Sequence, residues 1–271
     1  MLGLGLGHGH GHGHEASAHG SEPSRRSFLR TAVGAVSVGV TWCGGGAALA
    51  AESASKTSDA GAEEIVVPLT KAARDALTPE QILAAAKAGN ERFRSGKKAH
   101  RDVVVELQKT AGGQSPAAVV LGCIDSRAPA EIIFDLGLGD IFNCRVAGNI
   151  ENPDMLGSME FSTKLSGAKV IAVMGHTACG AVKGAIAGAE LGNLTQLLKK
   201  IKPAVDATTY DGKRTADNAE FVDAVARTSV RQTVERIRKN SPVIAELEKS
   251  GAIKMVGCFY DLATGGVEFL G

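Results

Sequence analysis

The chain has no excess of charge of either sign. Its 271 residues include 30 Lys and Arg against 29 Asp and Glu, and residues 51–271 hold 27 of each kind, because the first 50 residues contain three basic and two acidic ones. A net charge of zero gives no electrostatic reason to bind nucleic acid or an anionic membrane surface. We therefore expect neither as a partner.

Histidine and paired cysteines are also scarce. Five of the seven histidines lie in the first 50 residues, which leaves His100 and His176 for any imidazole chemistry in the rest of the chain. None of the five cysteines belongs to a Cys-x-x-Cys pair, a pattern frequent in closed structural zinc sites. A structural zinc site of that kind is not expected.

The N-terminal region lacks the strongly apolar run of about 20 residues that a transmembrane helix needs. Its apolar stretch, residues 31–47, is short and rich in Gly, Ala and Ser. The stretch follows the segment SRRSFLR (24–30) and precedes ALA (48–50), a small-x-small cleavage pattern. We interpret residues 1–50 as a Gly/His-rich extension plus a twin-arginine signal peptide, with an uncleaved anchor as the alternative. This predicts a periplasmic or otherwise extracytoplasmic protein whose mature chain has no stable membrane insertion.

The remaining residues divide into a linker and one domain. Residues 51–77 begin with a Ser/Ala-rich stretch without periodicity and are expected to be flexible, and residues 78–271 are expected to form a single catalytic domain. Expected helices cover residues 78–95, 101–110, 129–136, 154–165, 179–187, 218–239 and 243–249. Expected strands cover residues 117–123, 140–146, 169–175, 253–261 and 267–270, and residues 191–213 are polar and weakly patterned. Alternating strands and helices predict an α/β fold with a mostly parallel sheet, closed by an antiparallel edge at the C-terminus.

Two short segments combine side chains that hold zinc. The segment CIDSR (123–127) follows one apolar run, and HTACG (176–180) follows another. Functional groups gather beyond the carboxyl ends of parallel strands, so Cys123 and His176 are expected at one edge of the sheet. His176 and Cys179 are three residues apart at a helix start and can face one metal ion. Two thiolates and one imidazole leave an exchangeable fourth position, as in catalytic zinc sites.

The fourth position is left for a water, a hydroxide or Asp125. Zinc lowers the pKa of a bound water to about 7, and a nearby acceptor can orient the resulting hydroxide. Asp125 can serve as that acceptor if Arg127 holds it off the metal in a bidentate pair; the alternative is a plain surface ion pair. The residues alone thus predict a zinc enzyme of hydrolytic or hydration type, with one Zn²⁺ per chain.

The four cysteines beyond residue 50 allow a second interpretation. In an oxidising compartment they could form two disulfides. Cys123 and Cys179 lie beside Asp125 and His176, which favours metal binding. Cys144 and Cys258 fall inside apolar strands and are expected to be buried thiols.

The motifs and their order resemble those of the β-class carbonic anhydrases. The segments that carry the resemblance are GCIDSR (122–127), DIF (140–142), RVAGN (145–149) and GHTACG (175–180). The similarity extends from GNERF (89–93) to YDL (260–262), which covers nearly all of the expected domain.

The resemblance implies a function and a set of roles. It implies reversible hydration of CO2 to bicarbonate and a proton by a zinc-bound hydroxide, with Zn²⁺ on Cys123, His176 and Cys179. It implies that Asp125 and Arg127 form a catalytic dyad that orients the nucleophile. It also implies that Gln114 hydrogen-bonds substrate and that the backbone amide of Gly180 lies at the CO2 pocket. Members of the family are dimers or higher oligomers, so a homodimer or a dimer of dimers is expected, with N-terminal helices that pack on the partner.

Two other functions and one departure from the family remain to be weighed. The same fold can hydrolyse CS2 or COS, and a non-catalytic zinc- or bicarbonate-binding relative would keep the fold without turnover. Some family members carry a regulatory bicarbonate pocket that uses a Trp three residues before the first zinc cysteine. Val120 stands at that position here, and we expect no such regulatory site.

Overall fold

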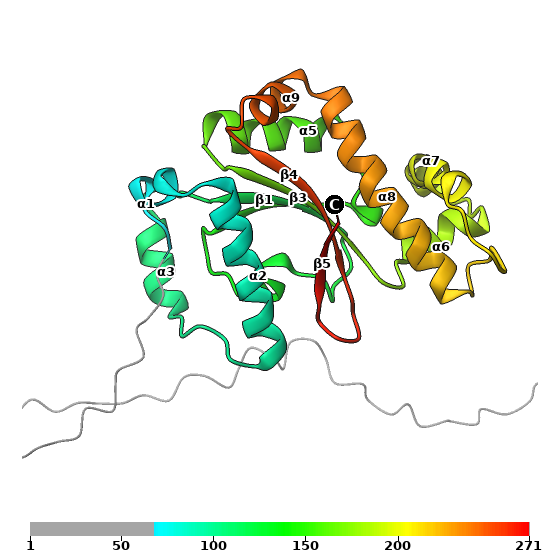
Figure 1. The fold of residues 1–271 in the computed structure, drawn as a ribbon, viewed down its shortest axis with the longest axis horizontal. Helices are drawn as coiled ribbons and strands as arrows, with labels where there is room; N and C mark the ends of the chain where they lie inside the picture. The colour runs from blue at the N-terminus through cyan, green and yellow to red at the C-terminus, as the bar shows by residue number, and fades with distance from the viewer. Residues whose placement is uncertain (1–67, 271) are drawn as a thin grey trace, which may run out of the picture. The chain divides into compact units, whose positions relative to one another are not determined.

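The computed structural model describes residues 68–270. The predicted extension and signal peptide, and the linker up to residue 67, lie outside the described residues. Within the described part a five-stranded sheet has the strand order β2-β1-β3-β4-β5, with β4 and β5 antiparallel and the other neighbours parallel. Figure 1 shows α8 and α2 on opposite sides of this sheet. The predicted α/β class and antiparallel C-terminal edge are therefore confirmed.

The elements follow the expected order. The strands are β1 (Ala118–Gly122), β2 (Ile141–Arg145), β3 (Val170–His176), β4 (Lys254–Tyr260) and β5 (Val267–Leu270). The helices are α1 (Lys71–Ala76), α2 (Pro79–Ser95), α3 (Val103–Thr110), α4 (Ala130–Ile133), α5 (Pro153–Glu160), α6 (Gly180–Ala187), α7 (Gly192–Ala207), α8 (Ala219–Asn240) and α9 (Pro242–Lys249), with short helical turns η2 (Ala147–Asn149) and η3 (Phe161–Leu165). In this part of the chain we find no helix both long and apolar enough to cross a bilayer.

The sheet is buried on both faces because successive side chains of each strand point to opposite sides. In β1, Val119 and Leu121 belong to the large apolar cluster that includes α7 and α8, whereas Val120 belongs to the cluster formed with α4 and part of α2. In β3, all seven residues are buried. Strands buried on both faces read as continuous apolar runs, which is why both runs were visible in the sequence.

Helix α8 approaches the sheet closely because two neighbouring strands present glycines to it. A Cβ added at Gly175 of β3 would lie 2.6 Å from the Val230 side chain, and one added at Gly257 of β4 would lie 2.8 Å from it. The bare backbone at these two positions lets Val230 of α8 rest directly on the strands. The end of β3, where His176 lies, is thereby fixed against α8.

One buried amide joins the two ends of the described chain. The side chain of Asn90 in α2 donates to the carbonyls of Ile133 (3.1 Å) and Gly265 (2.9 Å) and accepts from the Val267 amide (2.9 Å). Asn90 therefore ties α2 to α4 and to the β4–β5 hairpin.

The structure differs from the sequence prediction at several elements. The linker prediction for residues 51–77 is wrong at its end, because residues 71–76 form α1, capped by the Thr70 side chain. The helix predicted over 154–165 changes into the π-helical turn η3 after Glu160. The helix predicted over 129–136 shrinks to the four residues of α4. The weakly patterned segment 191–213 contains the 16-residue helix α7, with Pro203 inside it.

Candidate metal centre

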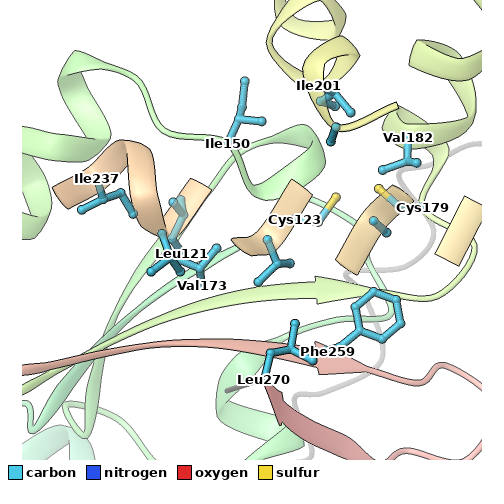
Figure 2. Close-up of a cluster of buried hydrophobic side chains, with 14 of the residues drawn as sticks. Leu121, Cys123, Ile150, Val173, Cys179, Val182, Ile201, Ile237, Phe259 and Leu270 are labelled. Atoms are coloured by element: carbon cyan, nitrogen blue, oxygen red, sulfur yellow. The ribbon is translucent and has the colours of Figure 1, made fainter. Parts of the chain in front are cut away.

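Three buried side chains converge beyond the carboxyl ends of β1 and β3. Cys123 follows β1, His176 ends β3, and Cys179 is the N-cap residue of α6. Their ligand atoms all lie within 4.8 Å of one another, and Figure 2 shows the two sulfur atoms turned toward each other. Because the chain passes from β1 to β2 on one side and then to β3 on the other, the cluster lies at the topological switch point of the sheet.

Helix α6 favours a thiolate at Cys179. The first N–H groups of a helix have no carbonyl partner within the helix and create a positive potential there. The contact with Cys123 and burial raise the pKa of Cys179, and the amides of Val182 and Ala181, which donate toward its sulfur, partly oppose that rise. These donors suit a negatively charged sulfur that binds a metal ion.

His176 is oriented by its own neighbour. Its Nδ1 lies 2.9 Å from the carbonyl oxygen of Thr177, so Nδ1 carries the proton and Nε2 has the free lone pair. His176 is 1% exposed, and its Nε2 is buried with no hydrogen-bond partner in the protein. A buried, unpaired ring nitrogen between two thiols fits a zinc ligand, because a metal ion would satisfy it.

The pKa values of the two thiols shift in opposite directions. The Cys179 thiol donates to Cys123, which lowers the pKa of Cys123 despite burial and raises the pKa of Cys179. Burial alone would lower the pKa of His176, but its contact with the Cys123 sulfur, followed by that with the Thr177 carbonyl, raises it. Zinc binding must therefore displace protons from this cluster.

Asp125 and Arg127 form the bidentate pair that the spacing predicts. Arg127 donates from Nε to one carboxylate oxygen of Asp125 (3.0 Å) and from Nη2 to the other (2.8 Å), and the Arg127 amide donates to the first (2.9 Å). The second oxygen, Oδ2, lies 3.9 Å from Nε2 of His176. Hydrogen bonding to Arg127 holds the pKa of Asp125 well below its usual range. An ionised carboxylate thus lies at the edge of the cluster, with its orientation fixed.

Two further groups support the loop that carries Cys123. Arg145, at the end of β2, donates to the carbonyl oxygens of Cys123 (2.8 Å) and Asp125 (2.6 Å). The Gly148 amide donates to the Cys123 sulfur at 3.4 Å. The guanidinium of Arg145 therefore stabilises the loop that carries Cys123 and Asp125.

Gly180 lies at the cluster, whereas Gln114 does not. Gly180 directly follows Cys179 as the first residue of α6. Gln114 is exposed and precedes β1, at the end of the strand opposite to Cys123. The five residues of β1 at about 3.3 Å each separate the two ends by roughly 16 Å. A substrate contact from Gln114 would require a second copy of the chain.

The remaining cysteines are not in disulfides. All four cysteines of the described residues are free thiols, which argues against the two-disulfide interpretation. Cys144 and Cys258 are 7% and 0% exposed, and burial raises the pKa of both. They are the buried thiols that the sequence indicated.

Sequence reasoning missed the supports of the segment between His176 and Cys179. The Ala178 amide donates to Asp223 of α8 (2.8 Å), and the Thr177 hydroxyl accepts from the Leu262 amide (3.0 Å). These partners lie 45 and 85 residues downstream, and no local pattern links them to the motif.

Comparisons with known proteins agree with this geometry. The model of the carbonic anhydrase family matches residues 118–267. Carbonic anhydrase 2 of Mycobacterium tuberculosis strain H37Rv is 37% identical over 187 residues, which cover 67% of this chain and 87% of that protein. The carbonic anhydrase of Mycolicibacterium smegmatis is 36% identical over 186 residues, which cover 68% and 89%.

Solved structures share the fold. A β-carbonic anhydrase of Sordaria macrospora, described as tetrameric, superposes with a TM-score of 0.54 at 27% identity, covering 71% of this chain and 96% of that one. The Coccomyxa β-carbonic anhydrase in complex with acetazolamide has a TM-score of 0.55 at 22% identity and covers 70% and 82%.

Proposed function

The chain belongs to the β-carbonic anhydrase family, and on that premise we propose that it catalyses the reversible hydration of CO2 to bicarbonate and a proton. The observation that carries the proposal is the convergence of Cys123, Cys179 and the unpaired Nε2 of His176, with the Asp125 carboxylate 3.9 Å from that nitrogen. This arrangement provides both a set of zinc ligands and an ionised acceptor beside it.

Cys123, His176 and Cys179 would hold the Zn²⁺ that the family uses. When bound there, zinc supplies Lewis acidity that makes water a nucleophile near neutral pH. Two anionic thiolates reduce that acidity compared with neutral ligands. The surrounding residues must therefore contribute to orienting the attacking water.

We assign that orienting role to Asp125. Its carboxylate is ionised, with its pKa held well below the usual range by hydrogen bonds from Arg127, and an ionised carboxylate only accepts hydrogen bonds. It can therefore take a hydrogen bond from the attacking water and direct a lone pair of that oxygen toward CO2. Arg127 does not reach the ligands; it fixes the direction of the carboxylate. The proposal also includes the Gly180 amide, which no i−4 carbonyl occupies at the start of α6, as a donor to a CO2 oxygen.

A homo-oligomer would complete the site with Gln114. Gln114 and the metal cluster lie at opposite ends of β1, so only a second copy can bring the two together. Mixing Gln114→Ala chains with Asp125→Ala chains tests this directly. If the sites are shared between chains, a mixed dimer regains one intact site, and activity should rise above that of either variant alone.

We further propose that the protein is exported by the twin-arginine pathway. The support is the SRRSFLR segment (24–30) followed by the ALA pattern (48–50). This pathway transports folded proteins, so zinc could bind Cys123 and Cys179 before either thiol meets an oxidant. Cell fractionation of the wild type and of an Arg25→Lys/Arg26→Lys double variant tests the export: only the wild type should reach the periplasm.

Stopped-flow CO2 hydration from pH 6 to 9, with zinc assayed in parallel, tests the activity. We expect turnover that rises with pH, follows zinc content and is lost in Asp125→Ala. Full zinc occupancy without CO2 turnover at any pH would contradict the proposal. CS2 and COS hydrolysis would then be assayed, and inactivity there as well would indicate a binding protein.

A further inference from the structure

The segment that joins two of the zinc ligands contains a strained residue. Ala178, between His176 and Cys179, has φ of +55°, in the left-handed region that residues with a Cβ avoid because the Cβ crowds the backbone carbonyl. This turn is what brings the Cys179 sulfur back toward His176 and Cys123. The ligand geometry thus depends on a backbone conformation that alanine does not favour by itself.

A carboxylate from another element stabilises this conformation. Asp223, in the second turn of α8, accepts a hydrogen bond from the Ala178 amide at 2.8 Å. This is the one hydrogen bond that Asp223 makes within the described residues. Because α8 is seated on β3 and β4 through Val230, the carboxylate is presented from a rigid support.

The charges around Asp223 show that it has no competing partner. The charged and titratable side chains that act on it are Arg227, one helical turn further along α8, the carboxylate of Asp261 and the ring of His176, and it forms an ion pair with none of them within the described residues. The Arg227 guanidinium already pairs with Glu268 at 2.7 Å and stacks on the Phe259 ring at 4.1 Å. The carboxylate of Asp223 is therefore free to accept the hydrogen bond from Ala178, in the segment between His176 and Cys179.

We propose that Asp223 is a positioning residue of the metal centre, which holds Ala178 in the left-handed conformation and so presets the distance between His176 and Cys179. It touches neither metal nor substrate. The inference rests on the zinc site of the proposed function and adds a residue from α8 to it. Outer residues that orient metal ligands typically contribute 10- to 100-fold to metal affinity or activity.

The test is the rate of zinc release from the holoenzyme to an excess of a coloured chelator. We expect Asp223→Ala to release zinc ~10- to 100-fold faster than the wild type. Asp223→Asn keeps an oxygen acceptor at the same place and should release zinc close to the wild-type rate. Glu235→Ala, which removes an exposed carboxylate from the same helix, is the matched control and should not change the rate.

A double-mutant cycle separates positioning from general stability. Glycine adopts positive φ without the penalty that alanine has, so Ala178→Gly should make the segment less dependent on Asp223. Asp223→Ala should then accelerate zinc release less in the Ala178→Gly protein than in the wild type.

Three results would overturn the inference: Asp223→Ala releasing zinc at the wild-type rate, Asp223→Asn releasing it as fast as Asp223→Ala, or Asp223→Ala having the same effect in both backgrounds. A wild-type protein that does not retain zinc would instead contradict the proposed function itself.

Discussion

At the scale of single residues, a substitution of Arg127 can distinguish two contributions of Asp125 to activity: its negative charge and the orientation of its carboxylate. Without Arg127 the pKa of Asp125 would rise toward its ordinary value of about 3.9, which still leaves it ionised at pH 6–9. Any loss of activity in Arg127→Ala must therefore come from a misdirected carboxylate. The spacing of the motif predicted this contact because both residues lie in one loop.

We expect Arg127→Ala to lower kcat/KM for CO2 hydration by about 10- to 100-fold and to leave the midpoint of the pH–activity profile unchanged. Stopped-flow assays between pH 6 and 9 measure both quantities. Arg94→Ala, which breaks an exposed pair with Glu91, serves as the control. A shifted midpoint with unchanged maximal activity would show that Arg127 acts through charge.

Gly148 is a second single-residue test, because its backbone and its surroundings both exclude a side chain. Its φ is +72°, and a Cβ there would lie 2.5 Å from Ile201 Cδ1 and 3.3 Å from the Ala181 Cβ. Gly148→Ala should lower the free energy of unfolding by ~1–3 kcal/mol from overpacking, beyond the conformational cost. It should also weaken zinc retention, since the Gly148 amide donates to Cys123.

Gly96→Ala is the matched control, because Gly96 has the same φ of +72° with nothing near a new Cβ. Urea unfolding measures the free energy of unfolding of both variants. The difference between their losses gives the contribution of the contact with Ile201, because the conformational cost of a positive φ is common to both. Equal losses of stability would show that the contact with Ile201 does not matter.

At the scale of elements, two helical glycines should respond to alanine with opposite signs. Alanine is favoured over glycine in a helix by about 1 kcal/mol. At Gly157 of α5 a Cβ meets nothing within 4 Å, whereas at Gly89 of α2 it would lie 1.9 Å from the Phe134 carbonyl oxygen. Gly157→Ala should therefore raise the urea midpoint and Gly89→Ala should lower it. A stabilising Gly89→Ala would show that α2 can move off α4.

The elements that sequence predicted well are those whose signals are local. Thr78 and Pro79 predicted the start of α2, and the structure shows the complete capping box between Thr78 and Gln81. Helix α1 was missed because its six residues follow a segment without periodicity. The change from α-helix to the π-helical turn η3 (Phe161–Leu165) was not predicted. The residues of this turn fit a helical pattern, and that pattern does not distinguish a π-helical turn from an α-helix.

At the scale of the whole molecule, the ligands were predictable but their supports were not. Cys123 and His176 follow buried strands, and parallel topology alone brings strand ends together. Asp223 and Leu262 reach the same segment only through tertiary packing, so no spacing in the sequence reveals them. Gln114 is the opposite case. Its position in the sequence matches the family motif, but within one chain it lies at the other end of β1 from the metal cluster.

The pH dependence of global stability should carry a contribution from Asp140. This carboxyl is 8% exposed, near Arg101 and Glu106, and burial raises its pKa. The folded state therefore binds this proton more tightly than the unfolded chain, whose pKa is about 3.9. Its contribution to stability is present below that value and is lost as pH rises through the folded-state pKa.

Urea unfolding of the wild type and Asp140→Asn from pH 3.5 to 7 measures this contribution. The stability of the wild type minus that of the variant should fall as pH rises from about 4. Both proteins are compared at the same zinc loading at each pH, so the difference between them removes the effect of the metal. A difference that rises with pH would show that pairing with Arg101 outweighs burial.

The hydrogen bonds of Asn90 also affect when the domain can complete its folding during synthesis. Its partners Gly265 and Val267 are synthesised 175 and 177 residues after it, which at ~5–20 residues per second means a delay of roughly 10–35 s on the ribosome. During that interval α2 has no hairpin to bind, and its buried amide has no complete set of partners. The contacts of Asn90 are therefore complete only after Gly265 and Val267 have emerged, and a nascent chain should depend on chaperones until then.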